Sequence, residues 1–421
     1  MKKPLVAIIS FPGNNCEVES VRAIRESNME ARLFRWNDDR KFLDNCDGYF
    51  LPGGFAYEDR GRSGMVAGRD SLLEFLAAKA GEGKAIIGNC NGAQVLIESG
   101  LIPLHKGLHM SLARNAIRDG AVWSAPGFLS EWIWITSSCD LERCATSNWK
   151  GVMHLPIAHG EGRFTTKDKD LMQDLKRNDQ IAFSYCDANG NVGDDPIRTP
   201  NGSMFAIAGL CNPAGNVVAL MPHPERTPKG KPYFDALRWW LTSKKNIERT
   251  MSIRKDTNGG RPVLPARIAK QAELFIDTII VNNEERTVEQ AARRVSPSLR
   301  LKQFRYVELG RTSPRDILTS ISLFNPHKEV AYVRRGNTMY RWDSTTKKEE
   351  PLDSARIEAL FSGLMLLRTD EPDTLSSAFG EGSKAGCAYV VKGIDEQALG
   401  SRLLEIFANP HASVLEELVS R

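Results

Sequence analysis

Short apolar runs alternate with segments of helical periodicity through the first part of the chain. The apolar runs predict strands because they are short and bounded by Gly, Pro or Asn. The segments between them carry apolar residues three and four positions apart, which predicts amphipathic helices. Strands are expected at residues 4–11, 30–36, 48–54 and 84–90, and helices at 16–28 and 69–83. Strands that are apolar on both faces favour a parallel sheet covered by helices.

Further strands follow in the same region, and a helix closes it. The apolar runs at 132–137, 180–186, 203–212 and 217–224 predict strands, some of them antiparallel because short Gly/Asn turns separate them. Residues 233–245 have the period of an amphipathic helix. We therefore expect residues 1–249 to form one α/β domain with an open sheet.

A second region follows a break in this pattern. Residues 250–267 are rich in polar residues, Gly and Pro and have no clear period, which predicts a linker. Beyond it, Asn-Pro-His occurs at 325–327 and again 84 positions later, at 409–411. Strand-like and helical runs precede both copies at similar offsets. The region therefore predicts a tandem of small α+β modules, at about 268–350 and 351–421.

Two details of these modules also follow from the pattern. A single module would leave one face of its sheet uncovered, so we expect the two to pack sheet to sheet. The run ANPHASVLEEL in the second copy is expected to be helical where the first copy continues as a strand. A chance match of the tripeptide is the alternative interpretation, and the matched strands argue against it.

Composition mainly excludes classes of protein. Of 421 residues, 41% are hydrophobic and 26% are charged, which is ordinary for a soluble globular protein. A net charge of +4 is small for this length and gives no case for nucleic acid or an anionic membrane as a partner. No apolar run approaches the roughly 20 residues of a membrane span. The eight cysteines form no CxxC pair, so we expect reduced thiols in a cytoplasmic protein.

A cysteine at a Gly-flanked corner is the first candidate for chemistry. In GNCNGAQ, Cys90 lies between a predicted strand and a predicted helix, with Gly88 and Gly92 on either side. A nucleophilic thiol needs a nearby base and donors for the oxyanion that it creates. The first N–H groups of a helix can supply those donors. The spacing alone fits a small buried thiol equally well.

A histidine and a carboxylate follow the last predicted strand of the same region. In MPHPER, His223 and Glu225 are two positions apart across a proline. A neighbouring carboxylate fixes the tautomer of a histidine and makes it more basic. Taken alone, this stretch is more typical of a surface histidine in a Pro-rich turn. Because ligands bind at the carboxyl ends of parallel strands, its combination with Cys90 favours a catalytic Cys–His–Glu group.

Five motifs in order carry a family resemblance. GNCNGAQ and MPHPER resemble the signature of class I glutamine amidotransferases, which have a flavodoxin-like open sheet. FPGNNCE, LPGGFAYEDRGRSG and PIAHGEGRF narrow the resemblance to the glutaminase subunits of phosphoribosylformylglycinamidine synthases, which act in purine synthesis. The resemblance covers about residues 1–245. It implies a glutaminase that passes ammonia to an ATP-dependent synthetase.

The resemblance also implies roles for single residues. Cys90 matches the nucleophile, and His223 matches the base that takes the thiol proton and later gives it to ammonia. Glu225 matches the carboxylate that orients the histidine.

The substrate contacts are implied in the same way. Gly53 and Gly54 match a loop whose backbone N–H joins that of Asn91 in the oxyanion hole. Gln94 falls where the family contacts the substrate glutamine.

Neighbours of these motifs carry weaker expectations. For Phe55, Tyr57 and Arg62, packing within their loop is as good an interpretation as a functional role. His159, in AHGEG, is expected in a Gly-rich loop that faces the pocket or a partner. Cys16 is expected to be a loop thiol near the pocket rather than a nucleophile.

The second region resembles the small S subunit of the same synthase, a ferredoxin-like module that works as a dimer bridging glutaminase and synthetase. Two tandem copies would place that dimer in one chain. No GxxxxGK[ST] motif occurs, and the chain is too short to include the synthetase. The resemblance therefore implies a separate synthetase chain as partner, which carries ATP and magnesium, and it predicts no metal or cofactor in this chain.

Two other functions stay open at this point. The glutaminase could feed ammonia to a different synthase, although AHGEG and FPGNNC speak against it. Alternatively, the chain could be a scaffold that keeps the fold without turnover, although Cys90, His223 and Glu225 are all present.

Overall fold

A computed structural model describes residues 2–104, 107–120, 122–243, 263–394 and 399–419. The chain divides into two compact units, and the boundary between them falls between residues 256 and 257. Residues 250–262 of the predicted linker lie outside the described residues, whereas its last two residues form the short strand β14 (Ala266–Arg267).

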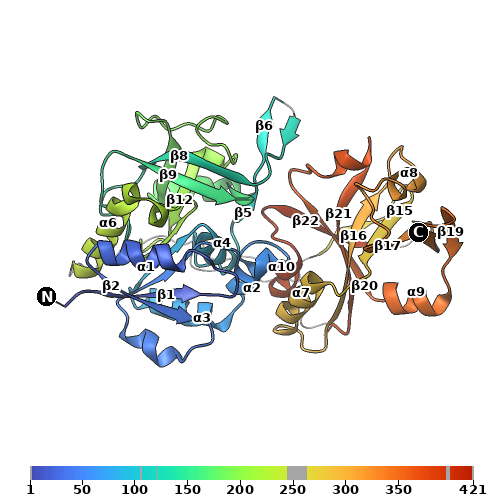
Figure 1. Cartoon of the computed structure of the whole chain (residues 1–421), viewed down its shortest axis with the longest axis horizontal. Helices are drawn as coiled ribbons and strands as arrows, with labels where there is room; N and C mark the ends of the chain where they lie inside the picture. Colours follow the sequence, from blue (N-terminus) through green and yellow to red (C-terminus); the bar gives the residue numbers. More distant parts are fainter. Residues whose placement is uncertain (1, 105–106, 121, 244–262, 395–398, 420–421) are drawn as a thin grey trace. The chain divides into compact units, whose positions relative to one another are not determined.

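The first unit is built on a nine-stranded sheet with the order β2-β1-β3-β4-β13-β12-β11-β8-β9 (Figure 1). Its first five strands in this order are parallel. They are β2 (Glu30–Arg35), β1 (Leu5–Ser10), β3 (Gly48–Leu51), β4 (Ala85–Asn89) and β13 (Val217–Leu220). This is the strand order of flavodoxin-like folds, so the predicted fold class of the first unit is confirmed.

The other four strands of this sheet are antiparallel. They are β12 (Ile207–Cys211), β11 (Ile181–Cys186), β8 (Leu129–Ser137) and β9 (Val152–His159). The pattern analysis missed β9, although buried and half-buried residues alternate along it, as expected for a strand with one face on the core. Two small sheets pair β5 (Ser111–Arg114) with β10 (Glu161–Thr165), and β6 (Ile117–Asp119) with β7 (Val122–Ser124).

Helices pack on both faces of the large sheet because its inner strands are apolar on both faces. In β1, Ala7 and Ile9 join one core cluster, whereas Val6 and Ile8 join the other. The α-helices are α1 (Glu17–Glu26), α2 (Met65–Gly68), α3 (Ser71–Gly81), α4 (Asn91–Glu98), α5 (Lys169–Arg177) and α6 (Lys231–Thr242). The described residues of the unit also form the 3-10 turns η1 (Arg40–Asn45), η2 (Ala56–Asp59), η3 (Met204–Ala206), η4 (Pro224–Arg226) and η5 (Pro228–Gly230).

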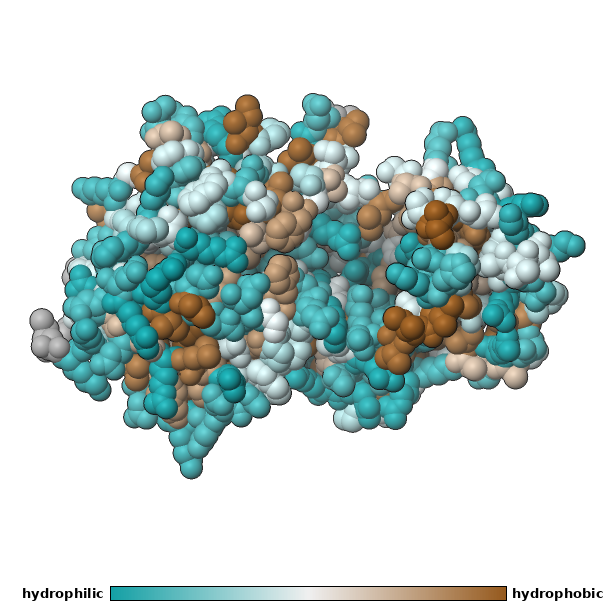
Figure 2. All heavy atoms as spheres, in the orientation of Figure 1, coloured by the Kyte–Doolittle hydropathy of each residue, from teal (hydrophilic) through white to brown (hydrophobic). Residues whose placement is uncertain are grey.

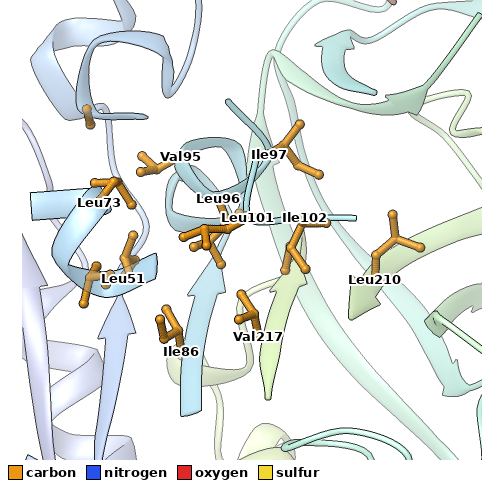
Figure 3. Packing of buried hydrophobic residues seen from close by; sticks show 14 of the residues in the cluster. Leu51, Leu73, Ile86, Val95, Leu96, Ile97, Leu101, Ile102, Leu210 and Val217 are labelled. Carbon is orange, nitrogen blue, oxygen red and sulfur yellow. The ribbon is translucent and has the colours of Figure 1, made fainter. Parts of the chain in front are cut away.

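Helix α4 is buried along its whole length, since all eight of its residues are buried. Figure 3 shows Leu96 of α4 facing Ile86 of β4 and Val217 of β13, while Val95 and Ile97 lie on other sides of the helix within the same core cluster. A helix that is buried on all sides has little freedom to move, so the residue that begins it is held firmly in place.

The second unit contains another nine-stranded sheet, with the order β14-β22-β20-β21-β16-β15-β17-β18-β19. Its first half comprises β15 (Glu273–Thr278), α7 (Asn283–Arg293), β16 (Arg300–Glu308), α8 (Pro314–Leu318), β17 (Glu329–Arg335), β18 (Thr338–Asp343) and β19 (Lys348–Pro351). After α9 (Ser354–Phe361), its second half comprises β20 (Leu364–Asp370), η6 (Ser376–Phe379), β21 (Lys384–Lys392), α10 (Ser401–Phe407) and β22 (Ser413–Leu418).

The two halves repeat one arrangement. In the first, β15 lies between β16 and β17 and is antiparallel to both; in the second, β20 lies between β21 and β22 in the same way. The Asn-Pro-His turns also match. Asn325 Oδ1 accepts the N–H of His327 at 3.0 Å, and Asn409 Oδ1 accepts the N–H of His411 at 3.0 Å. The halves differ where the eleven-residue α7 corresponds to the four-residue η6.

Two expectations for this unit are wrong. The halves do not pack sheet to sheet; they join edge to edge, through antiparallel pairing of β16 with β21 along nine residues of each strand. The run after Asn409 is not helical, because Ser413–Leu418 forms β22 beside β20. Pairing of the two edges leaves both sheet faces available for separate cores. Phe304 stacks on Phe361 of α9 on one face, and Val307 joins Ile317 of α8 on the other.

No helix among the described residues is both long enough and apolar enough to cross a membrane. On the face drawn in Figure 2, hydrophilic side chains predominate and apolar ones form small separate groups.

Candidate active site

Cys90 occupies a strained corner between β4 and α4. Its φ of 49° and ψ of −108° are costly for a residue with a side chain, and Cys90 directly precedes the first residue of α4. Its N–H donates to the carbonyl of Leu220 in β13 at 2.8 Å, which anchors the corner to the neighbouring strand. Strain of this kind persists only where the surroundings enforce it, and it is the geometry of a nucleophile elbow.

Two glycines make the corner possible because there is no room for a side chain at either. A Cβ on Gly88 would lie 2.5 Å from the carbonyl oxygen of Gly92, and a Cβ on Gly92 would lie 2.0 Å from that of Leu51. The close approach of α4 to β3 and β4 therefore requires glycine at both positions.

His223 and Glu225 form a fully buried pair at the end of β13. His223 Nδ1 and Glu225 Oε1 are 2.5 Å apart, and Asn89 Nδ2 donates to Glu225 Oε2 at 3.0 Å. Asn89 is fixed in turn by the hydroxyl of Tyr233, which donates to its Oδ1 at 3.0 Å. Glu225 thereby holds the Nδ1–H tautomer and leaves Nε2 of the imidazole available.

The charges of His223 and Glu225 stabilise each other. Burial by itself would lower the pKa of His223, but the negative charges of Cys90 and Glu225 raise it well above its ordinary value. Burial opposes ionisation of Glu225, yet the positive charge of His223 and the hydrogen bonds that Glu225 accepts lower its pKa. The imidazolium and the carboxylate therefore stabilise each other within the buried pair.

The nucleophile and the base are neighbours without a direct hydrogen bond. Cys90 Sγ lies 3.6 Å from the carbonyl oxygen of Ala158, and no partner for His223 Nε2 is found among the described residues. Contacts of this kind often tighten only when substrate is bound. The buried Nε2 is thus free to exchange a proton with a group bound at Cys90.

The loop that carries Gly53 and Gly54 is fastened to the loop before α1. The carbonyl of Gly53 accepts the N–H groups of Asn15 and Cys16, each at 3.3 Å, and the N–H of Phe55 donates to the carbonyl of Gly13 at 2.9 Å. Gly54 has a φ of +136°, and a Cβ there would lie 2.6 Å from the backbone of Asn14. These contacts hold Gly53 beside the imidazole, since a Cβ on Gly53 would lie 2.7 Å from His223 Cε1.

Asn91 connects this loop to α4 through its side chain. Its Oδ1 accepts the N–H of Ala56 at 3.0 Å and a bond from Asn14 Nδ2 at 3.3 Å. Its Nδ2 donates to Asp59 Oδ1 at 3.1 Å and to Gln94 Oε1 at 2.9 Å. The two sides of the predicted oxyanion hole are therefore joined by one buried amide.

His159 is buried next to the site, but it does not lie in a Gly-rich loop as expected. It is the last residue of β9, and neither ring nitrogen has a partner among the described residues. Burial and the positive charge of His223 lower its pKa to about 3, so the ring stays neutral at physiological pH. Its ring fills the space over Gly162, where a Cβ would lie 2.2 Å from Cε1.

The three loop residues with open roles pack against neighbouring side chains. Phe55 is exposed and stacks on Phe128, with ring centroids 6.4 Å apart. Tyr57 has a left-handed φ of 53° and packs against Phe11. Arg62 forms a bidentate ion pair with Glu98 at the end of α4. Their described contacts are those of loop packing.

The site contains one group of potential metal ligands. Ligand atoms of Cys16, His223 and Glu225 lie within 4.8 Å of one another. However, His223 Nδ1 is bonded to Glu225, and Arg226 donates to Cys16 Sγ at 3.0 Å. A guanidinium on the sulfur opposes a second cation, so this donor set fits a hydrogen-bonded cluster better than a metal centre.

Comparison with known proteins assigns the first unit to a family. A family model described as the CobB/CobQ-like glutamine amidotransferase domain matches residues 3–248. The chain belongs to this family. The match includes Cys90, His223 and Glu225, and the resemblance inferred from the motifs is confirmed.

The first unit is also similar to individual proteins of known name. A protein of Methanothrix thermoacetophila named phosphoribosylformylglycinamidine synthase subunit PurQ is 40% identical over 224 residues, which span 52% of this chain and 86% of that protein. Its namesake in Pyrococcus furiosus is 35% identical over 52% of this chain and 87% of its own length. Among solved structures, PurLQS from Thermotoga maritima is 30% identical over 57% of this chain and 99% of that chain, with a TM-score of 0.45.

Several supporting residues were not predicted from the sequence. Asn14, Asn89, Asp59 and Arg226 hold the loops and the Glu225 pair, but each contact joins positions far apart in the chain. The adjacent asparagines in FPGNNC were the available signal, because asparagine is common where loops are held by side-chain hydrogen bonds. The other three positions lie within GNCNGAQ, LPGGFAYEDRGRSG and MPHPER, but these motifs do not indicate which residues they contact.

Asp59 is an acid whose ionisation the fold opposes. Burial and the nearby charge of Glu161 raise its pKa to about 7, against the lowering effect of bonds from Ser63 and Asn91. It ends a run of three residues with left-handed φ, at Tyr57, Glu58 and Asp59. The oxyanion loop therefore carries a carboxyl group that is partly protonated at neutral pH.

We expect replacement of Asp59 by asparagine to stabilise the first unit increasingly as pH rises. The folded-state pKa lies above the unfolded value, so the wild type loses stability as pH rises from about 4 through 7, where Asp59 ionises in the fold. Asp59→Asn lacks this loss. Urea unfolding at several pH values, with the exposed Asp119→Asn as control, should give a difference from wild type that grows to about pH 7 and then levels. A pH-independent difference would contradict it.

Proposed function

We propose that this chain is the glutamine-hydrolysing component of a phosphoribosylformylglycinamidine synthase. The proposal is carried by the strained corner at Cys90 beside the buried His223–Glu225 pair, in a chain that is 40% identical to a protein named as a subunit of that synthase.

In the first half of the reaction, Cys90 Sγ attacks the carboxamide carbon of glutamine. The oxyanion that forms accepts hydrogen bonds from the backbone N–H groups of Asn91 and Gly54, which lie on the two loops that the Asn91 side chain joins. His223 Nε2 takes the proton of the Cys90 thiol and then gives it to the leaving nitrogen, and Glu225 stabilises the imidazolium in between. The products are ammonia and a γ-glutamyl thioester on Cys90.

In the second half, water hydrolyses the thioester. The neutral His223 takes a proton from the water as its oxygen attacks the carbonyl carbon, and the proton returns to the thiolate of Cys90 as glutamate leaves. Glutamate and the starting enzyme result. Glu225 keeps the imidazole in one orientation through both halves, which is why its carboxylate is bonded on both oxygens.

The ammonia is used by a separate synthetase chain. That partner binds ATP and magnesium and converts formylglycinamide ribonucleotide to formylglycinamidine ribonucleotide, while this chain needs no cofactor of its own. Glutamine is the substrate of this chain, Gln94 contacts it, and the complex is cytoplasmic. Phe55 and Phe128, which are exposed and stacked, and the exposed Trp132 on β8 offer an apolar rim for contact with the partner.

The second unit bridges this glutaminase to the synthetase, as a tandem counterpart of the small S subunit. The repeated strand arrangement and the matching Asn-Pro-His turns support this role. A different ammonia-using synthase and a scaffold without turnover are the alternatives. Identification of the synthetase that co-purifies with this chain from the native host tests the first alternative. A glutaminase assay on the complex tests the second, because a scaffold would not release glutamate.

Replacement of the reacting residues should separate glutamine use from ammonia use. Cys90→Ala should lower glutamine hydrolysis by the complex about 10³-fold or more, because the thioester cannot form, and leave synthesis from added ammonia intact. His223→Ala should be similarly severe, whereas Glu225→Gln should be milder because the base remains.

These rates are measured as glutamate release, with the buried Cys46→Ala as a control for the loss of a core thiol. Hydrolysis at the wild-type rate by Cys90→Ala would assign the nucleophile elsewhere.

Removal of the second unit should uncouple the chain from its partner. A chain ending at residue 250 should fold, because the first unit has its own cores on both sheet faces. In pull-down experiments it should capture the synthetase poorly, and its glutamine hydrolysis should be weak. Capture as strong as that by the full chain would show that the second unit is not the bridge.

A further inference from the structure

Cys16 is a buried thiol beside the base, and the mechanism above does not use it. It directly precedes α1 and has no exposed surface. Its Sγ lies within 4.8 Å of a ring nitrogen of His223 and of a carboxylate oxygen of Glu225. A free cysteine in this place needs a physical account, because a plain apolar residue would fill the same volume.

The thiol of Cys16 is held on both sides. Arg226 Nη2 donates to Sγ at 3.0 Å, and the S–H can donate to Asn15 Oδ1 at 3.4 Å. The backbone is fixed as well, since its N–H donates to the carbonyl of Gly53 and its carbonyl accepts the hydroxyl of Ser20 at 2.6 Å. Cys16 therefore joins the oxyanion loop to the turn that carries the base.

Gly53 lies against both the thiol and the imidazole. A Cβ on Gly53 would lie 2.7 Å from His223 Cε1 and 3.1 Å from Cys16 Sγ. The ring is thus confined by the Gly53 backbone and by Cys16 on that side. Loss of the sulfur would open a space into which the imidazole could turn.

Two other roles for Cys16 fit the contacts less well. A second nucleophile would need an oxyanion hole of its own, but the N–H of Cys16 is already bonded to Gly53. A metal ligand would need a sulfur without a guanidinium on it, and Arg226 occupies that position.

We propose that Cys16 is a positioning residue, which together with Arg226 holds the His223 imidazole against Gly53 so that Nε2 stays turned toward Cys90. The proposal deepens the proposed function and rests on it, in that His223 serves Cys90 as base. It assigns Cys16 no contact with substrate.

Five groups face His223, directly or through a neighbour, and they come from four elements. They are Cys90 at the corner before α4, Glu225 on η4, Cys16 before α1, His159 at the end of β9, and Arg226 through Cys16. In each variant described next, only the substituted residue among these groups changes.

The test is the rate at which iodoacetamide alkylates Cys90 in the full-length chain, followed by mass spectrometry of the Cys90 peptide from pH 5 to 10. Only the thiolate reacts, so the rate at neutral pH reports how well the imidazolium supports it. Cys16→Ala should slow alkylation at pH 7 by roughly threefold or more, and the rates should converge above about pH 9.5. Cys16→Ser, which keeps a donor and an acceptor, should lie between Cys16→Ala and the wild type.

Arg226→Gln provides a second variant that removes no hydrophobic side chain, because Arg226 is exposed as a residue and only its guanidinium reaches the buried thiol. Arg226→Gln should shift the alkylation profile in the same direction as Cys16→Ala. The double variant Cys16→Ala/Arg226→Gln should shift it no further than Cys16→Ala alone, because both substitutions remove the same contact. Cys46→Ala, which removes a buried thiol elsewhere in the unit, should leave the profile unchanged.

An unchanged profile in Cys16→Ala and in Arg226→Gln would overturn the proposal, as would additive shifts in the double variant. If Cys16→Ala does not fold, the Cys16→Ser and Arg226→Gln profiles decide in the same way. Alkylation of Cys90 does not require glutamine. The test of Cys16 is therefore independent of whether the chain hydrolyses glutamine. A chain that hydrolyses no glutamine contradicts the proposed function alone, and a profile without shifts contradicts the role of Cys16 alone.

Discussion

The buried hydrogen bond between His223 and Glu225 is the interaction on which the rest of the site depends. Neither group could remain charged at this depth by itself, and removing one partner of such a pair costs about 3–5 kcal/mol. The carboxylate of Glu225 is hydrogen-bonded on both oxygens, to His223 and to Asn89. The sulfurs of Cys90 and Cys16 lie next to the imidazole of His223. The cluster is thereby stable only as a whole, which ties the base to the nucleophile.

Sheet topology brings this cluster together. Cys90 and His223 follow β4 and β13, which are adjacent parallel strands, and Gly53 follows β3, the neighbour of β4 on the other side. The carboxyl ends of all three strands meet at one edge of the sheet. The strained backbone at Cys90 is tolerated because α4 is buried on all sides and Gly92 lets it approach β3.

The sequence was sufficient for the parallel half of the first sheet, because its strands are apolar runs separated by glycines and helices of regular period. It was also sufficient for the Cys90 corner, whose glycines are local. It was not sufficient for β9, whose apolar run is interrupted by His154 and Pro156, or for β22, where Glu416 and Glu417 leave no clear alternation of apolar and polar residues. Contacts such as those of Arg226 with Cys16 join positions 210 residues apart, and no local pattern encodes them.

The most direct test of the account is to identify the residue that carries the acyl group during turnover. The complex would be mixed with isotopically labelled glutamine and quenched in acid within one turnover, and its peptides would be analysed by mass spectrometry. The account predicts a labelled γ-glutamyl thioester on the peptide that contains Cys90, and none on the peptide that contains Cys16. Label on Cys16, or glutamate release without any labelled cysteine peptide, would contradict it.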